Sequence, residues 1–456
     1  MPLRSAYPSY RNSGIDFLGQ LPESWTVTRI ANVFEERKVF NHPDEPLLSI
    51  DRYLGIIKQS DTGRKVRAPK DRAGYKLIEP GELGYNILNA FMGSVGVSRY
   101  RGIVSPAYAV ARLRTEQEPW YFHYLLRTSL YQRQFNRFSY GIMYERNRLY
   151  YDRFKVIPIP VPPKLDQETI VAYLRAQDAH IARFIKAKRD LIALLTEQKL
   201  RIIDHAVTRG LDASVKLKPS GIDWLSEVPG HWELRRLKFL ASNTTNQTTT
   251  KASDEIYLAL EHVQSWTGVA RPLEGEVEFA STVKRFVADD VLFGKLRPYL
   301  AKVTRANCAG VCVSEFLVLR SRKELILPAY LEQLLRCKRV IDLINSSTAG
   351  AKMPRADWTF ISNVRLPVPR KDEQEAILSY IGLETKDLDD AIARAEDEIK
   401  LVREYRDRLI ADVVTGQVDV RGWTPGPDDV VTDEDLAALD DGEDDEAQGE
   451  EDDDDD

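Results

Sequence analysis

Cationic and aromatic side chains cluster in the middle of each half of this 456-residue chain. Residues 52–72 contain seven Lys or Arg, and residues 127–151 contain five Arg among seven Tyr or Phe. Such cations bind phosphate oxygens, and bidentate Arg contacts to base edges add sequence choice. The clusters predict nucleic-acid contacts at Lys58, Arg64, Lys65, Arg67, Lys70, Arg72, Tyr140, Arg146 and Arg148 in the first half, and at Lys284, Arg285, Lys295, Arg297, Tyr299, Lys302, Lys352 and Arg355 in the second.

The net charge of −6 conceals a basic body and an acidic end. Residues 428–456 contain 18 Asp or Glu and no Lys or Arg, so the preceding residues hold 52 acidic against 64 basic side chains, a balance of +12. A basic body suits a polyanionic partner. The acidic end cannot bury apolar surface, and we expect it to be a disordered, solvated tail.

Sequence motifs of catalysis are missing. A methyltransferase needs a Gly-rich cofactor loop and an Asn-Pro-Pro or Asp-Pro-Pro step, and neither is present. The string Gly294-Lys295-Leu296 lacks the hydroxyl and the upstream Gly of a phosphate loop. The six His are scattered, and three Cys are too few for a four-ligand metal site. We therefore expect no catalytic residue, metal or cofactor in this chain, and we expect its thiols to be buried.

The composition excludes a membrane protein. No apolar run approaches the roughly 18 residues of a membrane span, and the first residues lack the apolar core of a signal peptide. Apolar residues make up 43% and charged residues 29%, which is typical of a globular chain. The sequence predicts a cytoplasmic protein.

Two sequence motifs occur twice, 207 residues apart. The opening motif Ser-Gly-Ile-Asp-(Phe/Trp)-Leu-x-x-(Leu/Val)-Pro-x-x-Trp spans residues 13–25 and 220–232. The joint motif Pro-Val-Pro-x-x-x-x-Gln-Glu begins at Pro160 and at Pro367. The residues between the two motifs diverge. This pattern predicts an internal repeat of two similar α+β domains, because β-rich runs such as 103–113 and 311–319 alternate with turns and helical patches.

A long helix is expected after each joint motif. Apolar residues recur about every 3.5 residues from Ile170 through Phe184 and Leu191 to Ile202, and again over residues 377–409. Each helix of about 40 residues would measure roughly 60 Å and bury its apolar seam, most economically against the other helix. Taken alone, the seams are equally consistent with a rigid scaffold.

The two duplicated motifs resemble those of the specificity subunit of type I restriction-modification systems, over roughly residues 7–420. The resemblance implies two target-recognition domains and two long helices that form an antiparallel coiled coil with pseudo-twofold symmetry. Each domain would read one half of an asymmetric, bipartite site in double-stranded DNA, and the helices would set the spacer and dock two methyltransferase subunits. S-adenosylmethionine, ATP and Mg would then belong to the methyltransferase and the restriction/translocase subunits.

The resemblance also implies boundaries and best contacts. Lys295 and Arg297 match a recognition-domain string over residues 290–299, whereas its counterpart, residues 82–89, lacks both cations. The family pattern does not require the acidic tail, which is either a competitor for the cationic grooves or a passive solubilising arm. The implied regions are 1–157 and 211–364 for the recognition domains, 158–210 and 365–420 for the helical regions, and 421–456 for the tail.

Two other functions remain open at this point. A stand-alone nuclease with a duplicated DNA-binding fold would cleave DNA as a single purified chain. A non-catalytic coiled-coil adaptor would bind protein, and its cations would show no salt-sensitive affinity for a specific duplex.

Overall fold

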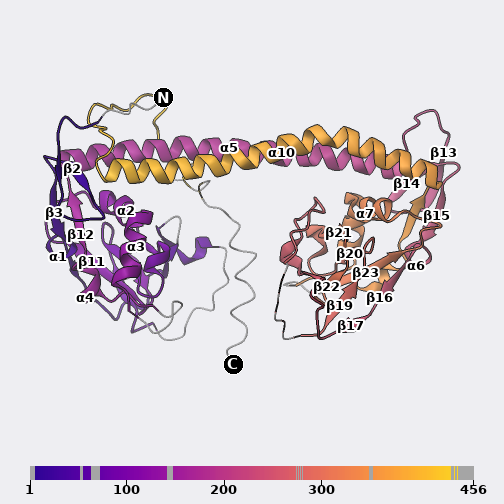
Figure 1. Cartoon of the computed structure of the whole chain (residues 1–456), viewed down its shortest axis with the longest axis horizontal. Helices are drawn as coiled ribbons and strands as arrows, with labels where there is room; N and C mark the ends of the chain where they lie inside the picture. Colours follow the sequence, from indigo (N-terminus) through magenta and orange to yellow (C-terminus); the bar gives the residue numbers. More distant parts are fainter. Residues whose placement is uncertain are drawn as a thin grey trace. The chain divides into compact units, whose positions relative to one another are not determined.

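The computed structural model describes residues 6–51, 55–62, 72–140, 147–273, 275, 277, 279, 281–348, 353–432, 436 and 439. The chain folds into two compact units, of which unit 1 comprises residues 1–190 and 396–456 and unit 2 comprises residues 191–395. Each unit contains one globular part and portions of both long helices, α5 (Lys164–Arg209) and α10 (Lys371–Val414) (Figure 1). Within the described ranges, none of the helices has the length and apolar character needed to cross a bilayer.

A four-stranded antiparallel sheet of order β4-β11-β8-β9 forms the centre of unit 1, and helices α2 and α3 pack against it (Figure 1). Tyr85 and Val95 of the sheet share one buried core with Phe122, Leu125 and Phe135 of the helices. Short ribbons β5–β6 and β7–β10 complete the domain. The elements are β4 (Phe34–Glu36), β5 (Leu48–Asp51), β6 (Gly55–Lys58), β7 (Lys76–Ile78), β8 (Leu83–Asn86), β9 (Val95–Val97), β10 (Gly102–Val104), β11 (Tyr108–Leu113), α2 (Pro119–Arg127), α3 (Ser129–Phe138) and α4 (Tyr151–Phe154).

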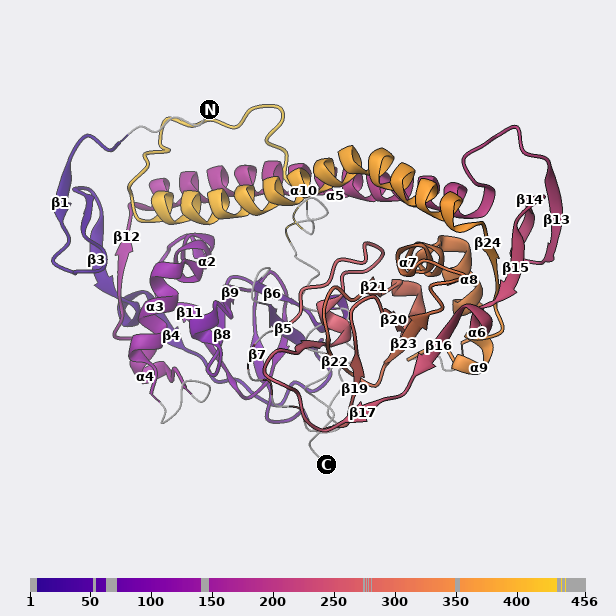
Figure 2. The same ribbon diagram turned by 45° about the vertical axis from the view of Figure 1, so that its right-hand side comes forward.

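Unit 2 has a corresponding sheet, β16-β23-β20-β21, covered by helices α7 and α8 (Figure 2). Phe293 and Leu319 of this sheet are buried with Tyr330, Leu334 and Ile341 of the helices. A second sheet, β17-β19-β22-β18, contains one parallel pair, β18 and β22. The elements are β16 (Ala241–Thr244), β17 (Gln247–Thr248), β18 (Ile256–Leu258), β19 (Val283–Phe286), β20 (Val291–Gly294), β21 (Val303–Arg305), β22 (Gly310–Cys312), β23 (Phe316–Ser321), α7 (Pro328–Arg336) and α8 (Lys338–Ser346).

An antiparallel ribbon leads from each domain into the long helix that follows it. Strand β3 (Thr26–Arg29) pairs with β12 (Pro158–Val161), and β15 (Glu233–Arg236) pairs with β24 (Arg365–Val368). Every residue pair of the first ribbon recurs 207 residues later in the second. The prolines of the joint motif fit here because a two-stranded ribbon leaves edge positions where no amide donor is needed.

The Gln of each joint motif ties the first turn of a long helix to its domain. Gln167 is fully buried, and its Oε1 accepts a hydrogen bond from the Glu118 amide at 3.0 Å. Gln374 is also fully buried and accepts from the Leu327 amide at 2.8 Å. Each Nε2 donates to the carbonyl of the proline five residues earlier. The side-chain amide of Gln supplies both a donor and an acceptor, which fits the repeated Gln.

The long helices contact each other within each unit. In unit 1, Asp178 of α5 binds Arg406 of α10 at 2.7 Å, and Lys188, further along α5, binds Glu398, earlier on α10. The two helices are therefore antiparallel in unit 1. In unit 2, Lys199 of α5 pairs with Asp389 of α10.

The expected 3.5-residue seam is right at the start of α5 and wrong in its middle. Leu174 and Ile181 are buried, but Phe184 and Leu191 are 39% and 41% exposed, and Ile185 is buried instead. A straight helix has 3.6 residues per turn, so a strict 3.5-residue pattern drifts by about 20° per heptad. The buried stripe on α5 accordingly shifts by one residue, from Phe184 to Ile185.

Candidate nucleic-acid interface

The loop after β20 carries the cations that the sequence favours most in the second domain. Strand β20 is held at its start by buried Asp290, which accepts hydrogen bonds from the Arg320 guanidinium at 2.7 and 2.8 Å. Beyond the strand, the Lys295 amide donates to Glu315 at 2.9 Å, and the Arg297 amide donates to Pro354 at 2.8 Å. The backbone of the loop is thus fixed at both cationic residues.

The same loop has two non-glycine residues in the left-handed region. Arg297 has φ +48° and Ala301 has φ +49°, on either side of a short 3₁₀ turn that projects Tyr299, which is 45% exposed. Such conformations cost free energy and persist where the surrounding structure imposes them, often at binding sites. Here they flank exposed Tyr299.

Arg355, which comes much later in the sequence, also pairs with this loop. An isolated β-bridge pairs Leu296 with Arg355, whose side chain is 58% exposed and lies 3.2 Å from Glu315. Among the described residues, the side chains of Lys295 and Arg297 have no ion-pair partner. Four predicted contact residues, Lys295, Arg297, Tyr299 and Arg355, therefore form one cluster, which we call the β20 loop cluster. Lys352 lies outside the described residues.

Lys284 has a structural role that the sequence does not reveal. Its side chain is buried, and its Nζ donates to the carbonyls of Ser314 at 3.0 Å and Phe316 at 2.7 Å. Lys76 holds the corresponding place in unit 1, where it is buried and bonded to the carbonyls of Pro106 and Tyr108. Burial lowers the pKa of both ammonium groups. We remove Lys284 from the set of phosphate contacts because its ammonium cannot reach DNA.

Two further predicted cations of unit 2 contribute little free charge. The Arg285 guanidinium binds the Glu255 carboxylate at 2.6 Å, so its positive charge is neutralised within the domain. Lys302 is 8% exposed and has interactions of its own. Among the described predicted contacts of this domain, the cations without an ion-pair partner are therefore Lys295 and Arg297, which are half-buried.

Unit 1 presents a different cluster. Tyr140 is 51% exposed and bridges to exposed Arg148 as an isolated antiparallel pair. The Arg153 guanidinium lies 5.8 Å from the Tyr140 ring centroid, and Tyr150 lies 5.5 Å from the same ring. Sequence reasoning missed Arg153, although its place among aromatic residues was a usable signal. Together these four residues form an exposed cation–aromatic surface.

The other predicted contacts of unit 1 are scattered. Lys58 lies over the Tyr100 ring at 5.0 Å, and Arg72 is half-buried. Five predicted residues lie outside the described part of the chain: Arg64, Lys65, Arg67, Lys70 and Arg146.

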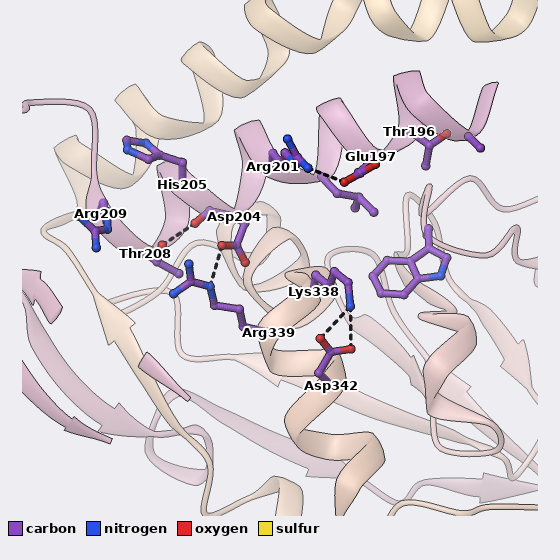
Figure 3. Close-up of a pocket in the computed structure, with 13 residues that line it drawn as sticks. Thr196, Glu197, Arg201, Asp204, His205, Thr208, Arg209, Lys338, Arg339 and Asp342 are labelled. Atoms are coloured by element: carbon purple, nitrogen blue, oxygen red, sulfur yellow. Dashed lines mark hydrogen bonds and ion pairs between the residues drawn. The ribbon is translucent and has the colours of Figure 1, made fainter. Parts of the chain in front are cut away.

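A pocket of about 690 Å³ in unit 2 lies between α5, α8 and Trp266 (Figure 3). Its three carboxylates are all paired: Asp204 with Arg339 at 3.0 Å, Asp342 with Lys338 at 2.8 Å, and Glu197 with Arg201 at 2.6 Å (Figure 3). Within the described residues, no group of three or more His, Cys, Asp or Glu has the arrangement of a metal site.

The thiols and the start of the tail differ in part from expectation. Cys312 and Cys337 are buried as predicted, but Cys308 is only half-buried. Residues 421–432, expected at the start of a disordered tail, contact unit 1 through Arg421, Trp423 and Asp429. Packing against α5 provides these residues with partners that their composition does not reveal.

Comparisons with known proteins match the duplicated motifs and the fold. No family model matches the chain. The chain is 23% identical over 225 residues to the specificity subunit of the type I restriction enzyme EcoDI from Escherichia coli, and this match covers 47% of the chain and 48% of that subunit. It therefore spans about half the length of this relative. A putative type I restriction enzyme specificity subunit, MjaX, from Methanocaldococcus jannaschii is 20% identical over 441 residues, covering 89% of this chain and 96% of that protein.

A solved structure has a fold similar to that of this chain. A chain from a study of complex assembly and conformational transition of the type I R-M system aligns with a TM-score of 0.55 at 16% identity, covering 86% of this chain and 98% of that chain. The resemblance predicted from the motifs is thus confirmed: this chain is similar, over most of its length, to the specificity subunits of type I restriction enzymes.

Proposed function

We propose that this protein is the DNA-specificity subunit of a type I restriction-modification complex. Each globular domain reads one half of a bipartite, asymmetric site in double-stranded DNA. The observation that carries the proposal is the β20 loop cluster, in which half-buried Lys295 and Arg297 have no ion-pair partner among the described residues, in a chain similar to specificity subunits.

The cluster suits a DNA backbone on physical grounds. Lys295 and Arg297 have no ion pair to break within the described residues, so phosphate binding releases counterions without a compensating loss inside the protein. The rigid loop backbone lowers the entropy cost of ordering these side chains on binding. Tyr299 adds an exposed ring beside the cations, as base and sugar contacts require.

The two domains differ where they would contact DNA, which supports an asymmetric site. The segment after β8 in unit 1 corresponds to the β20 loop, but it has Ile87 and Asn89 at the positions of Lys295 and Arg297. Unit 1 instead presents the cation–aromatic surface around Tyr140. Two domains with different contact chemistry read different half-sites, and the long helices that connect them set an unread spacer of about one helical turn, roughly 34 Å.

The proposed subunit is non-catalytic. Methyl transfer from S-adenosylmethionine and ATP-driven translocation and cleavage belong to partner subunits, two methyltransferase chains and the restriction/translocase chains. The paired long helices offer these partners a docking surface, formed as an antiparallel coiled coil. Exposed apolar side chains on both helices, such as Leu194, Leu383 and Leu401, support this role.

The salt dependence of DNA binding tests the proposal. We expect the double variant Lys295→Ala/Arg297→Ala, purified with its methyltransferase subunits, to lower the slope of log affinity against log salt by about two. The matched control is Lys338→Ala, which removes an exposed cation already paired with Asp342. Fluorescence anisotropy with a duplex containing the recognised site measures both. An unchanged slope in the double variant would remove the β20 loop cluster from the interface.

A further inference from the structure

The chain beyond α10 lies along the surface of α5 in unit 1. Residues 423–432, which we call the strap, make three contacts there. The Trp423 ring meets the Tyr173 ring edge-on at 5.6 Å. Asp429 binds the His180 ring at 2.7 Å, and the Arg183 guanidinium donates to the carbonyls of Asp428 at 3.0 Å and Val430 at 3.3 Å.

The three contacts define a direction and a face. Tyr173, His180 and Arg183 lie on one side of α5 because helical residues seven and ten apart share a face. Their partners follow in the same chain order, so the strap runs parallel to α5 over about 15 Å. The Asp429 carboxylate also accepts from the Gly426 amide at 2.7 Å, and these two hydrogen bonds, first to the amide and then to His180, hold its pKa below the usual range. The strap is thus a folded element.

The strap leaves other apolar side chains of the helix pair in unit 1 exposed. Tyr173 is 5% exposed, and burial, with Tyr405 of α10 nearby, raises its pKa to about 12. In the same unit, Phe184 of α5 is 39% exposed, and Leu401 and Tyr405 of α10 are 63% and 42% exposed. These exposed apolar side chains of the helix pair are suited to a larger partner than the strap.

The repeat provides an internal comparison. The counterpart of Tyr173, 207 residues later, is Tyr380 in unit 2, which is 37% exposed. The counterparts of His180 and Arg183 are the exposed residues Asp387 and Asp390. Carboxylates at these positions repel an acidic segment, so the strap fits the face in unit 1 and not the one in unit 2. The two faces share an aromatic residue and differ in the groups that hold the strap.

We propose that the strap is a built-in competitor for one of the two methyltransferase docking faces of this chain. The inference rests on the proposed function, which places a methyltransferase subunit on each pair of helix portions. The face in unit 2 accepts its subunit directly, whereas the face in unit 1 accepts one only after the strap leaves. His180 and Arg183 therefore serve to hold the strap, and the two docking events differ in affinity.

The first experiment tests the covered face without any partner. A labelled peptide of residues 423–432 is titrated against the chain lacking residues 423–456, which keeps buried Val420 and the Asp419–Arg421 pair. We expect binding to this truncated chain, at least tenfold weaker binding to the full chain, and loss of binding in truncated Arg183→Glu. Lys164→Glu, an exposed position at the start of α5, is the matched control. Equal binding to truncated and full chains would overturn the proposal.

The second experiment counts partners. Native mass spectrometry follows the full chain, the truncated chain and full-length Arg183→Glu during titration with the methyltransferase subunit. We expect the second subunit to bind the truncated and Arg183→Glu chains at least tenfold more tightly than the full chain. Deletion of residues 433–456 alone, which keeps the strap and removes sixteen Asp and Glu, should leave that affinity unchanged.

The outcomes distinguish failure of the competition from failure of the proposed docking role. Two subunits bound with the same affinity by full and truncated chains would overturn the competition and leave the specificity role intact. Absence of any methyltransferase binding, in every variant, would overturn the docking role and the competition with it.

Discussion

Lys76 and Lys284 hold the same place in the two domains and do the same work. Each ammonium joins two backbone carbonyls at a point where a β-turn meets the sheet. A buried ammonium is stable only where such acceptors satisfy it, since an unpaired buried charge costs several kcal/mol. Lys295, eleven residues after Lys284, differs from it. To bind a DNA phosphate, its ammonium has to stay free of partners within the protein.

We expect Lys284→Met to weaken folding and leave DNA contacts unchanged. Loss of two charge-assisted hydrogen bonds leaves two buried carbonyls unsatisfied, which costs about 1–3 kcal/mol in the free energy of unfolding. Urea denaturation and the salt slope of duplex binding check the two parts. A reduced salt slope with unchanged stability would return Lys284 to the DNA interface.

The three thiols should differ in reactivity. Burial raises the pKa of Cys312 to about 12, and burial with the Asp204 carboxylate raises the pKa of Cys337. With a pKa so far above the solution pH, only about one Cys312 in ten thousand is a thiolate at pH 8. We expect iodoacetamide to label Cys308 alone in the native chain and all three thiols in urea, as measured by peptide mass spectrometry. Labelling of native Cys312 at the rate of Cys308 would contradict this.

Sequence reasoning at this scale identifies residue types and misses their surroundings. Lys284 and Lys295 belong to one cationic stretch, and what separates them is a pair of carbonyls about thirty residues away from Lys284. Arg153 was missed although Tyr150, Tyr151 and Phe154 surround it in the sequence, and its contact with Tyr140, thirteen residues away, exists only in the fold. Burial and long-range partners are tertiary properties that residue spacing does not encode.

The long helices are held by different interactions in the two units. In unit 1, buried Asp178 accepts hydrogen bonds from Arg406 at 2.7 Å and from the Tyr124 hydroxyl at 2.8 Å, so one carboxylate joins α5, α10 and α2. In unit 2, Lys199 takes the place of Arg406 and pairs with Asp389, which is 49% exposed. Solvent screens the second pair far more than the first.

We expect Arg406→Met to destabilise unit 1 and Lys199→Met to have little effect on unit 2. Removing Arg406 leaves the Asp178 charge buried with one neutral donor, at a cost of about 3 kcal/mol. The exposed pair contributes less than about 1 kcal/mol. Hydrogen exchange of α5 amides, read separately for residues 170–185 and 195–205, measures both variants. Equal loss of protection in the two segments would refute the distinction.

The positions of the long helices in the sequence were more predictable than the faces that these helices bury. Both joint motifs do precede long helices, and the repeated Gln does have the same bonds in each unit. The apolar spacing nevertheless misplaced Phe184 and Leu191, because a pattern of 3.5 residues and a helix of 3.6 residues per turn diverge within two heptads. Composition also marked residues 421–432 as unfolded, since the α5 residues that hold them lie some 250 positions away.

At the scale of the molecule, the central claim is that two unlike domains on one chain read one split DNA site. Reading a split DNA site requires a duplicated scaffold with divergent middle segments. The shared parts fix the geometry, and the divergent parts determine which DNA sequence each domain reads. The β20 loop cluster in one domain and the surface around Tyr140 in the other provide unlike contact chemistry. Neither half-site alone would then be methylated.

A genome-wide map of N6-methyladenine in the source cell tests this claim most directly. The gene is compared intact, deleted, and replaced by Lys295→Ala/Arg297→Ala. The account predicts that deletion abolishes methylation at one asymmetric motif of two half-sites around a fixed unread spacer, and that the double variant lowers methylation at that motif. An unchanged methylation map after deletion, or loss of a single continuous motif, would contradict it.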